Sequence, residues 1–588
     1  MQAVEATLVI RTPRRSTRPR RRSGLAARLA LLAAGCSRSP ETPPAGAAPP
    51  PPAESAPEPP PARLRELPIA SPREAELAFT VHGAAELGLF ARGTGALEIE
   101  IAQEGAPATQ ASLPTAGDLR APATIRLPGS GSRALRVRVK APSPVQLETA
   151  RVKDEEPRLP AAKALVGALR GRSLVVVILD ALHAAHLSCH GYERATSPHA
   201  DALAREGVLF TGARSQAAWT IPSVATLFTG LEQERHGVRY FNNVLDGSMP
   251  TLAEAFRAAG YETAAYVQNL LVNAEAGFAR GFDRFEVYPG EARRLMPPAT
   301  LKHLAEPPRR PRFTYVHFLP PHAPYAPPEE FATRFGAADG EVDGTEPNIA
   351  RMGRANPRPE HPKVRRLAAL YDNHVAYADH LLGEVVRTVA AHGRDSTAIL
   401  FLSDHGEAFA QHGVLGHLWN VHEEIVHVPL ILWAPGSPLR AGSLVNEPVW
   451  MPDLLPTLAE LFGLDVDDGL PGRSLAGLLE GGGAAATRVL RLSALYEGDV
   501  PRQRAIVFGR FKLVSPGGRR PIELFDLEAD PGETRDVADA HPVVAAALRA
   551  ELASWAAEGL VRSGASDFKP DAAMQAELKA LGYVDDGK

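Results

Sequence analysis

The segment that decides the fold is SLVVVILD, residues Ser173–Asp180. Its residues 174 to 179 are all apolar, and most of them are β-branched. An unbroken apolar run of this length is typical of a strand that is covered on both faces, as in a parallel sheet. The run ends at Asp180, and the carboxyl ends of such strands are where α/β sheets bind ligands. We therefore expect Asp180 to lie in a binding site. The alternative is that Asp180 is a loop residue that caps the next turn.

A second segment, AAWTIPSVATLFTG (residues 217–230), predicts a helix with a threonine near its start. Pro222 suits the first turn of a helix because it has no N–H group to leave unpaired, and Gly230 suits the helix end. Thr220 then lies at or near the N-terminus, where free N–H groups and the helix dipole favour anions. The alternative is that Thr220 is an ordinary N-cap.

Short apolar runs alternate with helical patterns along the rest of this region. We expect strands at 262–267, 313–319, 398–403 and 428–434, and helices at 250–259 and 371–392. This alternation predicts an α/β fold with a mostly parallel, doubly wound sheet. Residues 320–366 are rich in proline, glycine and charge, and we expect a long substrate-facing loop there.

The expected strand 398–403 is followed directly by Asp404 and His405. These side chains and Asp180 follow two strands of one sheet, so they can meet at its carboxyl edge. Carboxylates suit hard divalent ions, and the imidazole extends the choice toward Mn or Zn. The pattern therefore predicts one divalent metal ion. A surface Asp–His pair is the alternative, but it does not explain the apolar strand in front.

These segments resemble the sulfatases of the alkaline phosphatase superfamily. The resemblance is carried by residues 174–191, 196–210 and 220–230, by SDHGE at 403–407 and by IELFDLEADPGE at 522–533, and it spans roughly residues 172 to 560. It implies an α/β fold with a mostly parallel sheet flanked by helices, followed by a C-terminal α+β subdomain. It also implies hydrolysis of sulfate or phosphate esters.

The core motif of this family is Cys or Ser, any residue, Pro, Ser, Arg, and then Thr-Gly four residues on. The chain matches it at Pro222, Ser223, Thr229 and Gly230. It departs at Thr220, where the family has the Cys or Ser that becomes formylglycine, and at Val224, where the family has Arg. Relatives that hydrolyse or transfer phosphoesters use an unmodified threonine, so the resemblance implies that Thr220 is the nucleophile.

The same resemblance implies a single-metal site. Its ligands would be Asp180, Thr220, Asp404 and His405, and the ion is left open among Mn, Mg, Ca and Zn. The calcium sulfatases carry a further aspartate at the position of Ala181.

The family's other site residues point to two catalytic histidines. His322 in PPHAPY corresponds to a substrate contact, and His417 in GHLW corresponds to a contact with the substrate or leaving group. We expect His317 inside its strand, and His422 and His427 in local packing.

The N-terminal part has a different composition. Residues 1–36 combine an arginine-rich start, a short apolar run and LAAGC, which predicts an export signal of the lipoprotein type with a lipid on Cys36. A disordered basic leader is the alternative. The expected units that follow are a Pro/Ala-rich linker at 37–62, a small β-sandwich-like domain at 63–155, a catalytic domain at 164–484, a C-terminal subdomain at 485–560 and a tail at 561–588.

The composition limits the partners. The net charge of −4 provides no general attraction to nucleic acid, and the two cysteines are too few for a disulfide framework. We expect a hydrolase exported to the bacterial cell envelope, attached to the membrane only by its lipid, that acts on a sulfated or phosphorylated small molecule or glycan. The alternatives are a phosphonate monoester hydrolase or phosphotransferase on the same fold, or an inactive glycan-binding surface protein, which the loss of arginine at Val224 would favour. The oligomeric state stays open.

Overall fold

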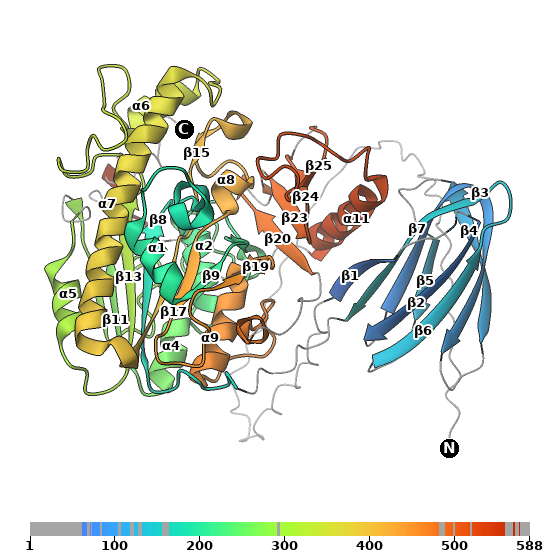
Figure 1. Ribbon diagram of the computed structural model, residues 1–588, viewed down its shortest axis with the longest axis horizontal. Coiled ribbons are helices and arrows are strands. Elements are labelled where there is room, and N and C mark those ends of the chain that lie inside the picture. The colour runs from blue at the N-terminus through green and yellow to red at the C-terminus, as the bar shows by residue number, and fades with distance from the viewer. Residues whose placement is uncertain are drawn as a thin grey trace, which may run out of the picture.

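The computed structural model describes residues 62–155 and 488–558 with short gaps, residues 164–290 and 295–480 without gaps, and residues 568–570 and 575–576. The expected export signal lies outside these residues, as do most of the linker and the tail. Among the helices that are described, none is both long and apolar enough to cross a membrane. Figure 1 shows three neighbouring parts: a central α/β body, a small sheet carrying α11, and a unit of β-strands.

The central sheet confirms the predicted fold class. Seven of its eight strands are parallel to one another, and only β17 runs against its neighbours. In spatial order the strands are β12 (Arg284–Val287), β11 (Glu262–Val267), β13 (Arg312–Pro321), β8 (Ser173–Asp180), β14 (Thr397–Leu402), β17 (Leu430–Trp433), β9 (Val208–Phe210) and β18 (Ser443–Val445).

Strand β8 lies in the middle of this sheet and is buried on both faces. Leu174, Val176 and Ile178 pack into one hydrophobic core, and the residues between them pack into a second core. Because successive side chains of a strand point to opposite faces, two cores require an apolar residue at every position. The first core includes residues of α2 (Thr220–Thr229), α4 (Leu252–Ala258) and α9 (Leu454–Phe462), and the second includes residues of α1 (Pro198–Glu206) and α7 (Pro362–Gly393).

The segment expected to be one long loop, 320–366, is partly helical, so that prediction was wrong in part. It contains α6 (Glu346–Gly353), and α7 begins at Pro362, nine residues earlier than expected from the sequence. Pro362 stands at the first position of α7, where proline is favoured, and His361 caps the helix.

Further short elements around the sheet are α3 (Gln233–His236), α5 (Pro298–Ala305), α8 (Glu423–Val426), α10 (Ala476–Leu479) and the paired strands β10 (Ala213–Arg214) with β19 (Val449–Trp450) and β15 (Ala408–Phe409) with β16 (Leu415–Gly416).

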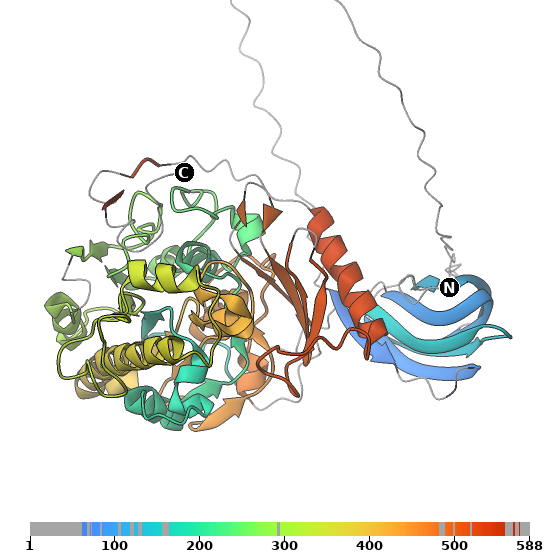
Figure 2. The same ribbon diagram turned by 90° about the horizontal axis from the view of Figure 1, so that it is seen from above.

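The N-terminal unit consists of antiparallel strands around a core of its own. The 19-residue strand β3 joins its two halves, because its first part pairs with β5 and β7 and its second part pairs with β4 and β6. The strands are β1 (Ala62–Leu67), β2 (Glu74–His82), β3 (Ala85–Gln103), β4 (Thr109–Gly117), β5 (Ala123–Leu127), β6 (Ser132–Lys140) and β7 (Gln146–Glu155). Phe90 of this unit packs against Ala546 and Ala547 of α11 (Pro542–Glu558). Figure 2 shows the N-terminal unit beside α11.

The C-terminal sheet lies between α11 and the central body. Its strands are β20 (Val489–Ser493), β23 (Arg504–Phe508), β24 (Phe511–Ser515) and β25 (Glu523–Asp526), and the short hairpin β21 (Tyr496–Glu497) and β22 (Val500–Pro501) lies between β20 and β23 in the sequence. Ile506 and Leu513 face α11, whereas Val507 and Val514 face Val421 of the central body. Alternate residues of each strand therefore join the two layers.

A buried ionic network also crosses this junction. The Nζ atom of Lys512, which is fully buried on β24, lies 2.8 Å from Glu423 Oε1 and 3.0 Å from Glu533 Oε1. Arg214 pairs with the same Glu423 at 2.8 Å. The network thus links the DPGE turn at 530–533 and the C-terminal sheet to the central body.

Replacing Lys512 by alanine is expected to lower the free energy of unfolding by about 3–5 kcal/mol, because the change removes the buried cation that Glu423 and Glu533 share. Urea denaturation of both proteins measures this difference. Arg510→Ala is the matched control, since Arg510 pairs with Asp526 at 3.4 Å on the exposed side and its loss should cost about 1 kcal/mol or less. Equal effects of the two substitutions would contradict a dominant role of the buried network.

Candidate active site

The site lies at the carboxyl edge of the central sheet, where β8 ends at Asp180 and β14 is followed by Asp404 and His405. Helix α2 supplies Thr220 as its first residue, and Trp219, not Thr220, is the N-cap. The expectation that Thr220 lies at a helix N-terminus is therefore met, whereas its alternative role as the cap is not. Parallel pairing of β8 with β14 brings the two acidic segments together.

Four atoms of the predicted metal ligands converge. The Nε2 atom of His405 lies 3.5 Å from Asp180 Oδ1 and 3.6 Å from Asp404 Oδ2. It also lies 3.4 Å from Thr220 Oγ1. All four side chains are fully buried. Ligand atoms about 2.1 Å from one cation are separated by about 3.0–3.5 Å, so this spacing suits a single small divalent ion.

The hydrogen bonds of these residues test whether a cation fits. Asp180 Oδ1 and Asp404 Oδ2 are buried and have no hydrogen-bond donor among the described residues. Buried carboxylate oxygens without donors are costly unless a cation is present. The other ring nitrogen of His405, Nδ1, lies 2.9 Å from the carbonyl oxygen of Gly406, which leaves the Nε2 lone pair for a metal. The donor set therefore fits a divalent ion.

The charge of the site points the same way. Burial alone raises the pKa of Asp180, but the hydrogen bond from His317 and the nearby imidazole charges outweigh it and hold this pKa well below its ordinary value. Burial alone lowers the pKa of His405, but the charges of Asp404 and Asp180 outweigh it and raise this pKa. Asp180 is thus held in its ionised form, and Asp180 and Asp404 together favour a positive charge at the position of His405.

The sequence analysis missed Asn269. Its Nδ2 group lies 2.5 Å from Asp180 Oδ2 and 3.3 Å from Thr220 Oγ1, so it can donate to a predicted metal ligand and to the predicted nucleophile. Its own Oδ1 accepts from the backbone N–H of Leu271, which orients the amide. A signal was present, because Asn269 follows the buried strand β11 just as Asp180 ends β8.

His317 lies inside β13, as predicted, but it also contacts the site. Its Nε2 atom lies 3.2 Å from Asp180 Oδ2, and its Nδ1 atom lies 2.9 Å from the hydroxyl oxygen of Tyr315. Asp180, His317 and Asp404 offer ligand atoms that all lie within 4.8 Å of one another. This histidine therefore belongs to the environment of the metal site.

Ala181, which stands where the calcium sulfatases have aspartate, contributes its backbone instead of a side chain. Its φ angle of 58° is in the left-handed region, which costs an alanine about 1–2 kcal/mol. In this conformation its N–H group lies 3.2 Å from Asp404 Oδ1, and its carbonyl oxygen accepts from the Tyr371 hydroxyl at 2.7 Å. The backbone after Asp180 is thus held in place by Asp404 and Tyr371.

Both predicted catalytic histidines are beside the four converging atoms. The ring of His417 lies 4.3 Å from that of His405 and 4.9 Å from that of His322, centre to centre. The Nδ1 atom of His417 lies 3.2 Å from Glu407 Oε1, a residue that the sequence analysis did not select. Burial and the charge of His405 lower the pKa of His417 to about 3, while burial raises the pKa of Glu407 to about 7.

Val224 stands where the family motif has arginine. Val224 is fully buried in the core that α2 shares with β8, so this position contributes no positively charged side chain to the site. Ser223, which matches the family motif, donates to the backbone carbonyl of Asp404 at 2.6 Å. Thus α2 remains joined to the segment that carries Asp404 and His405 even without the arginine.

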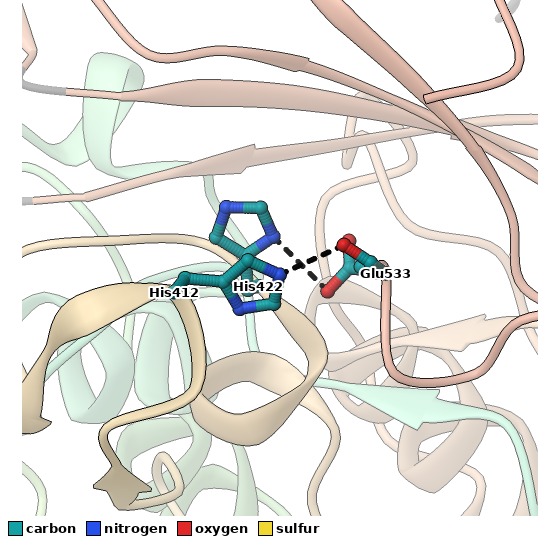
Figure 3. A group of neighbouring side chains, drawn as sticks. All are labelled: His412, His422 and Glu533. Atoms are coloured by element: carbon teal, nitrogen blue, oxygen red, sulfur yellow. Dashed lines mark hydrogen bonds and ion pairs between the residues drawn. The ribbon is translucent and has the colours of Figure 1, made fainter. Parts of the chain in front are cut away.

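A second group of possible ligands, His412, His422 and Glu533, lies outside this site. Figure 3 shows the two imidazole rings stacked beside Glu533. The rings are 3.6 Å apart and within 4° of parallel. A histidine binds metal along a lone pair in its ring plane, and two stacked, nearly parallel rings direct their lone pairs into separate planes, so this arrangement does not fit one ion. The ammonium group of Lys512 beside Glu533 also opposes a cation there.

The same cluster predicts a pH dependence of stability. Burial alone lowers the pKa of His412, but its hydrogen bond to Glu424 at 3.0 Å and the charge of that carboxylate raise it from 6.5 to about 9. Since the folded-state pKa lies above the unfolded-state pKa, this contribution is complete below pH 6.5 and is lost as the pH rises through 9.

We expect the free energy of unfolding to fall less between pH 6.5 and 9 in His412→Gln than in the natural protein. Glu424→Gln should have a similar effect, because it removes the partner of the same ion pair. Urea titrations at several pH values measure the slope. An unchanged slope in both variants would contradict this account of the His412 pair.

Comparisons with known proteins agree with this geometry. A family model described as "Sulfatase" matches residues 172–464, and one described as "N-sulphoglucosamine sulphohydrolase, C-terminal" matches residues 411–558. An arylsulfatase of Clostridium perfringens is 23% identical over 437 residues, which are 61% of this chain and 89% of that protein. A Delta 4,5-hexuronate-2-O-sulfatase of Bacteroides thetaiotaomicron is 23% identical over 412 residues, which are 62% of this chain and 84% of that protein.

Solved structures show the same fold. The phosphonate monoester hydrolase of Agrobacterium radiobacter has a TM-score of 0.54 and 24% sequence identity to this chain, and the match covers 68% of this chain and 100% of that one. The family models together extend from the central sheet through the C-terminal subdomain. The chain therefore belongs to the sulfatase family and is an ester hydrolase.

Proposed function

We propose that this protein is a metal-dependent hydrolase that cleaves sulfate or phosphate monoesters, with Thr220 as the nucleophile. The proposal rests on the convergence of four buried atoms, which are Thr220 Oγ1, Asp180 Oδ1, Asp404 Oδ2 and His405 Nε2. The two carboxylate oxygens among them have no hydrogen-bond donor among the described residues. A divalent cation, when bound, supplies charge that favours an ionised hydroxyl and a developing anion.

The residues of this chain account for the remaining chemistry. The hydroxyl of Thr220 gives its proton to solvent, its Oγ1 atom forms a bond to the sulfur or phosphorus of the ester, and the bond from the sulfur or phosphorus to the ester oxygen breaks. The leaving oxygen takes a proton from the pair of His417 and Glu407, in which Glu407, with its raised pKa, holds the proton and His417, whose ring lies 4.3 Å from that of His405, delivers it. Water then releases the sulfate or phosphate from Thr220. Asn269 Nδ2, 3.3 Å from Thr220 Oγ1, orients the hydroxyl for attack.

Phosphonate monoester hydrolysis or phosphoryl transfer is the second candidate. It is favoured by the threonine at position 220, because the family converts a cysteine or serine to formylglycine at this position. A glycan-binding role without catalysis has less support, because the nucleophile, both carboxylates and both histidines are all retained in one buried cluster.

A panel of 4-nitrophenyl sulfate, phosphate, phosphodiester and phosphonate esters tests the proposal. The protein would be stripped with a chelator and reloaded separately with Mn, Mg, Ca or Zn. We expect turnover that requires the added ion, with a preference for monoesters. Turnover that persists after complete removal of metal would contradict the proposed chemistry, and turnover of only the phosphonate would favour the second candidate.

The proposed setting is the bacterial cell envelope, to which the protein would be exported and attached by a lipid on Cys36. Its support is the sequence of residues 1–36, which are outside the described part of the chain. The natural substrate class proposed is a sulfated or phosphorylated small molecule or glycan. The sulfated-sugar name of the Bacteroides relative supports the glycan alternative.

A further inference from the structure

We infer that Tyr315 and His317 form a positioning pair, which turns one oxygen of Asp180 toward the metal ion and makes His317 a determinant of metal affinity in this chain. The inference rests on the proposed metal dependence. His317 would not be a ligand itself: it would hold a ligand in the orientation that binding requires.

The two oxygens of Asp180 differ in their hydrogen-bond partners. Oδ2 faces two nitrogen groups, with Asn269 Nδ2 at 2.5 Å and His317 Nε2 at 3.2 Å. Oδ1 has no donor among the described residues and is the oxygen that lies 3.5 Å from His405 Nε2. One side of the carboxylate is therefore occupied by the protein, and the other side faces the remaining predicted ligands.

The carboxylate of Asp180 determines which nitrogen of His317 carries the proton, and the hydroxyl group of Tyr315 pairs with the other nitrogen. A carboxylate oxygen can only accept, so Nε2 must be the protonated nitrogen that donates to Asp180. In the neutral ring, Nδ1 is then an acceptor, and the Tyr315 hydroxyl at 2.9 Å is the group that donates to it. The direction of donation thus runs from Tyr315 to His317 to Asp180, and both ring nitrogens are satisfied.

The pair is held rigidly by the sheet and by aromatic packing. Residues 315 and 317 are two apart on β13, so their side chains point to the same face. The register pairs His317 with Ile178 of β8, two residues before Asp180. The ring of Tyr315 packs edge-on against Phe228 at 5.0 Å, and Phe228 belongs to α2, the helix that begins with Thr220. Both side chains are fully buried.

The local sequence explains why Asp180 needs such support. The next residue is Ala181, so Asp180 is the only carboxylate that this strand end contributes. Partners that hold a ligand in place typically change metal affinity by about 10–100-fold when they are removed. A direct ligand would instead need its own lone pair toward the metal, but the Nε2 position of His317 is directed at Asp180 Oδ2.

The test compares Mn and Zn affinities of the metal-free natural protein and three variants by isothermal titration. His317→Leu should weaken binding by about 10–100-fold. His317→Gln should restore most of the affinity, because its terminal amide can reach Asp180 as Nε2–H does. Tyr315→Phe should give an intermediate loss. Circular dichroism and unfolding midpoints of the metal-free proteins check that all four are folded.

X-ray absorption of the zinc-loaded natural protein gives an independent readout, with one coordinated imidazole expected, from His405. Two imidazoles would overturn the inference, because His317 would then be a ligand. Equal affinities of the natural protein and a folded His317→Leu would also overturn it, while the proposed function stands. If the natural protein binds neither of these ions, nor Mg or Ca when they are titrated in the same way, the proposed function fails together with the inference.

Discussion

Replacing Thr220 by alanine is expected to abolish ester hydrolysis, with kcat lower by on the order of 10⁴-fold or more, since the loss of a nucleophile removes the reaction path itself. The Oγ1 atom lies 3.4 Å from His405 Nε2 and within 3.3 Å of Asn269 Nδ2, and no other described hydroxyl side chain has both contacts. The substitution should leave the fold intact, because α2 begins at this residue without using its side chain as a cap.

Thr220→Ser is the matched control. It keeps the hydroxyl group and removes only a methyl group, so we expect measurable turnover with the same metal requirement. Initial rates on the preferred 4-nitrophenyl ester, together with mass spectrometry of quenched reactions for a covalent adduct on residue 220, measure both effects. An alanine variant that keeps a tenth of the natural rate would exclude Thr220 as the nucleophile.

Asp404→Asn is expected to cause the second large loss, chiefly through metal affinity. Oδ1 of Asp404 accepts from the N–H groups of Ala181 and His405, at 3.2 and 3.0 Å, whereas Oδ2 has no donor among the described residues. An asparagine can keep the first two bonds, but it then places an NH₂ group where the cation needs an anionic oxygen. The affinity should fall by more than the roughly 100-fold upper range for a supporting residue, because a ligand itself is lost.

Metal content after dialysis and activity as a function of added ion measure this loss. Asp379→Asn is the matched control: this buried carboxylate accepts from the N–H groups of His199 and Ala200 at the start of α1. Burial raises the pKa of Asp379 to about 7, and the amide keeps one of its two acceptor oxygens, so the change costs a hydrogen bond there but removes no predicted metal ligand. The control should keep the natural metal affinity. If Asp404→Asn binds the ion as tightly as the control does, Asp404 is not a ligand.

Much of the site could be predicted because its signals are local in the chain. Strand β8 was recognisable from an apolar run that ends in a carboxylate, and the helical start at Thr220 from Pro222 and Gly230. The same rule applied to β11 would have selected Asn269, which directly follows the strand and Gln268. Asn269 is therefore as predictable as Asp180, since a polar residue behind a buried strand is visible in the sequence.

Other features depended on contacts between distant segments. Lys512 is one residue in an alternating strand pattern, and its burial between Glu423 and Glu533 follows from how the C-terminal sheet packs on the central body. His412 and His422 are ten residues apart on either side of β16, yet their rings stack because this segment folds back against the DPGE turn. No periodicity within either segment specifies such pairings.

The sequence by itself determined the fold class, the strands that end in the acidic residues, and the identity of the residues expected at the sheet edge. Those properties follow from burial patterns and chain ends, which short segments encode. Only the tertiary structure decided which oxygen of Asp180 faces His405 and which is held by His317 and Asn269. That division depends on the register of β13 against β8, in which His317 pairs with Ile178, and register is set by the packing of the whole sheet.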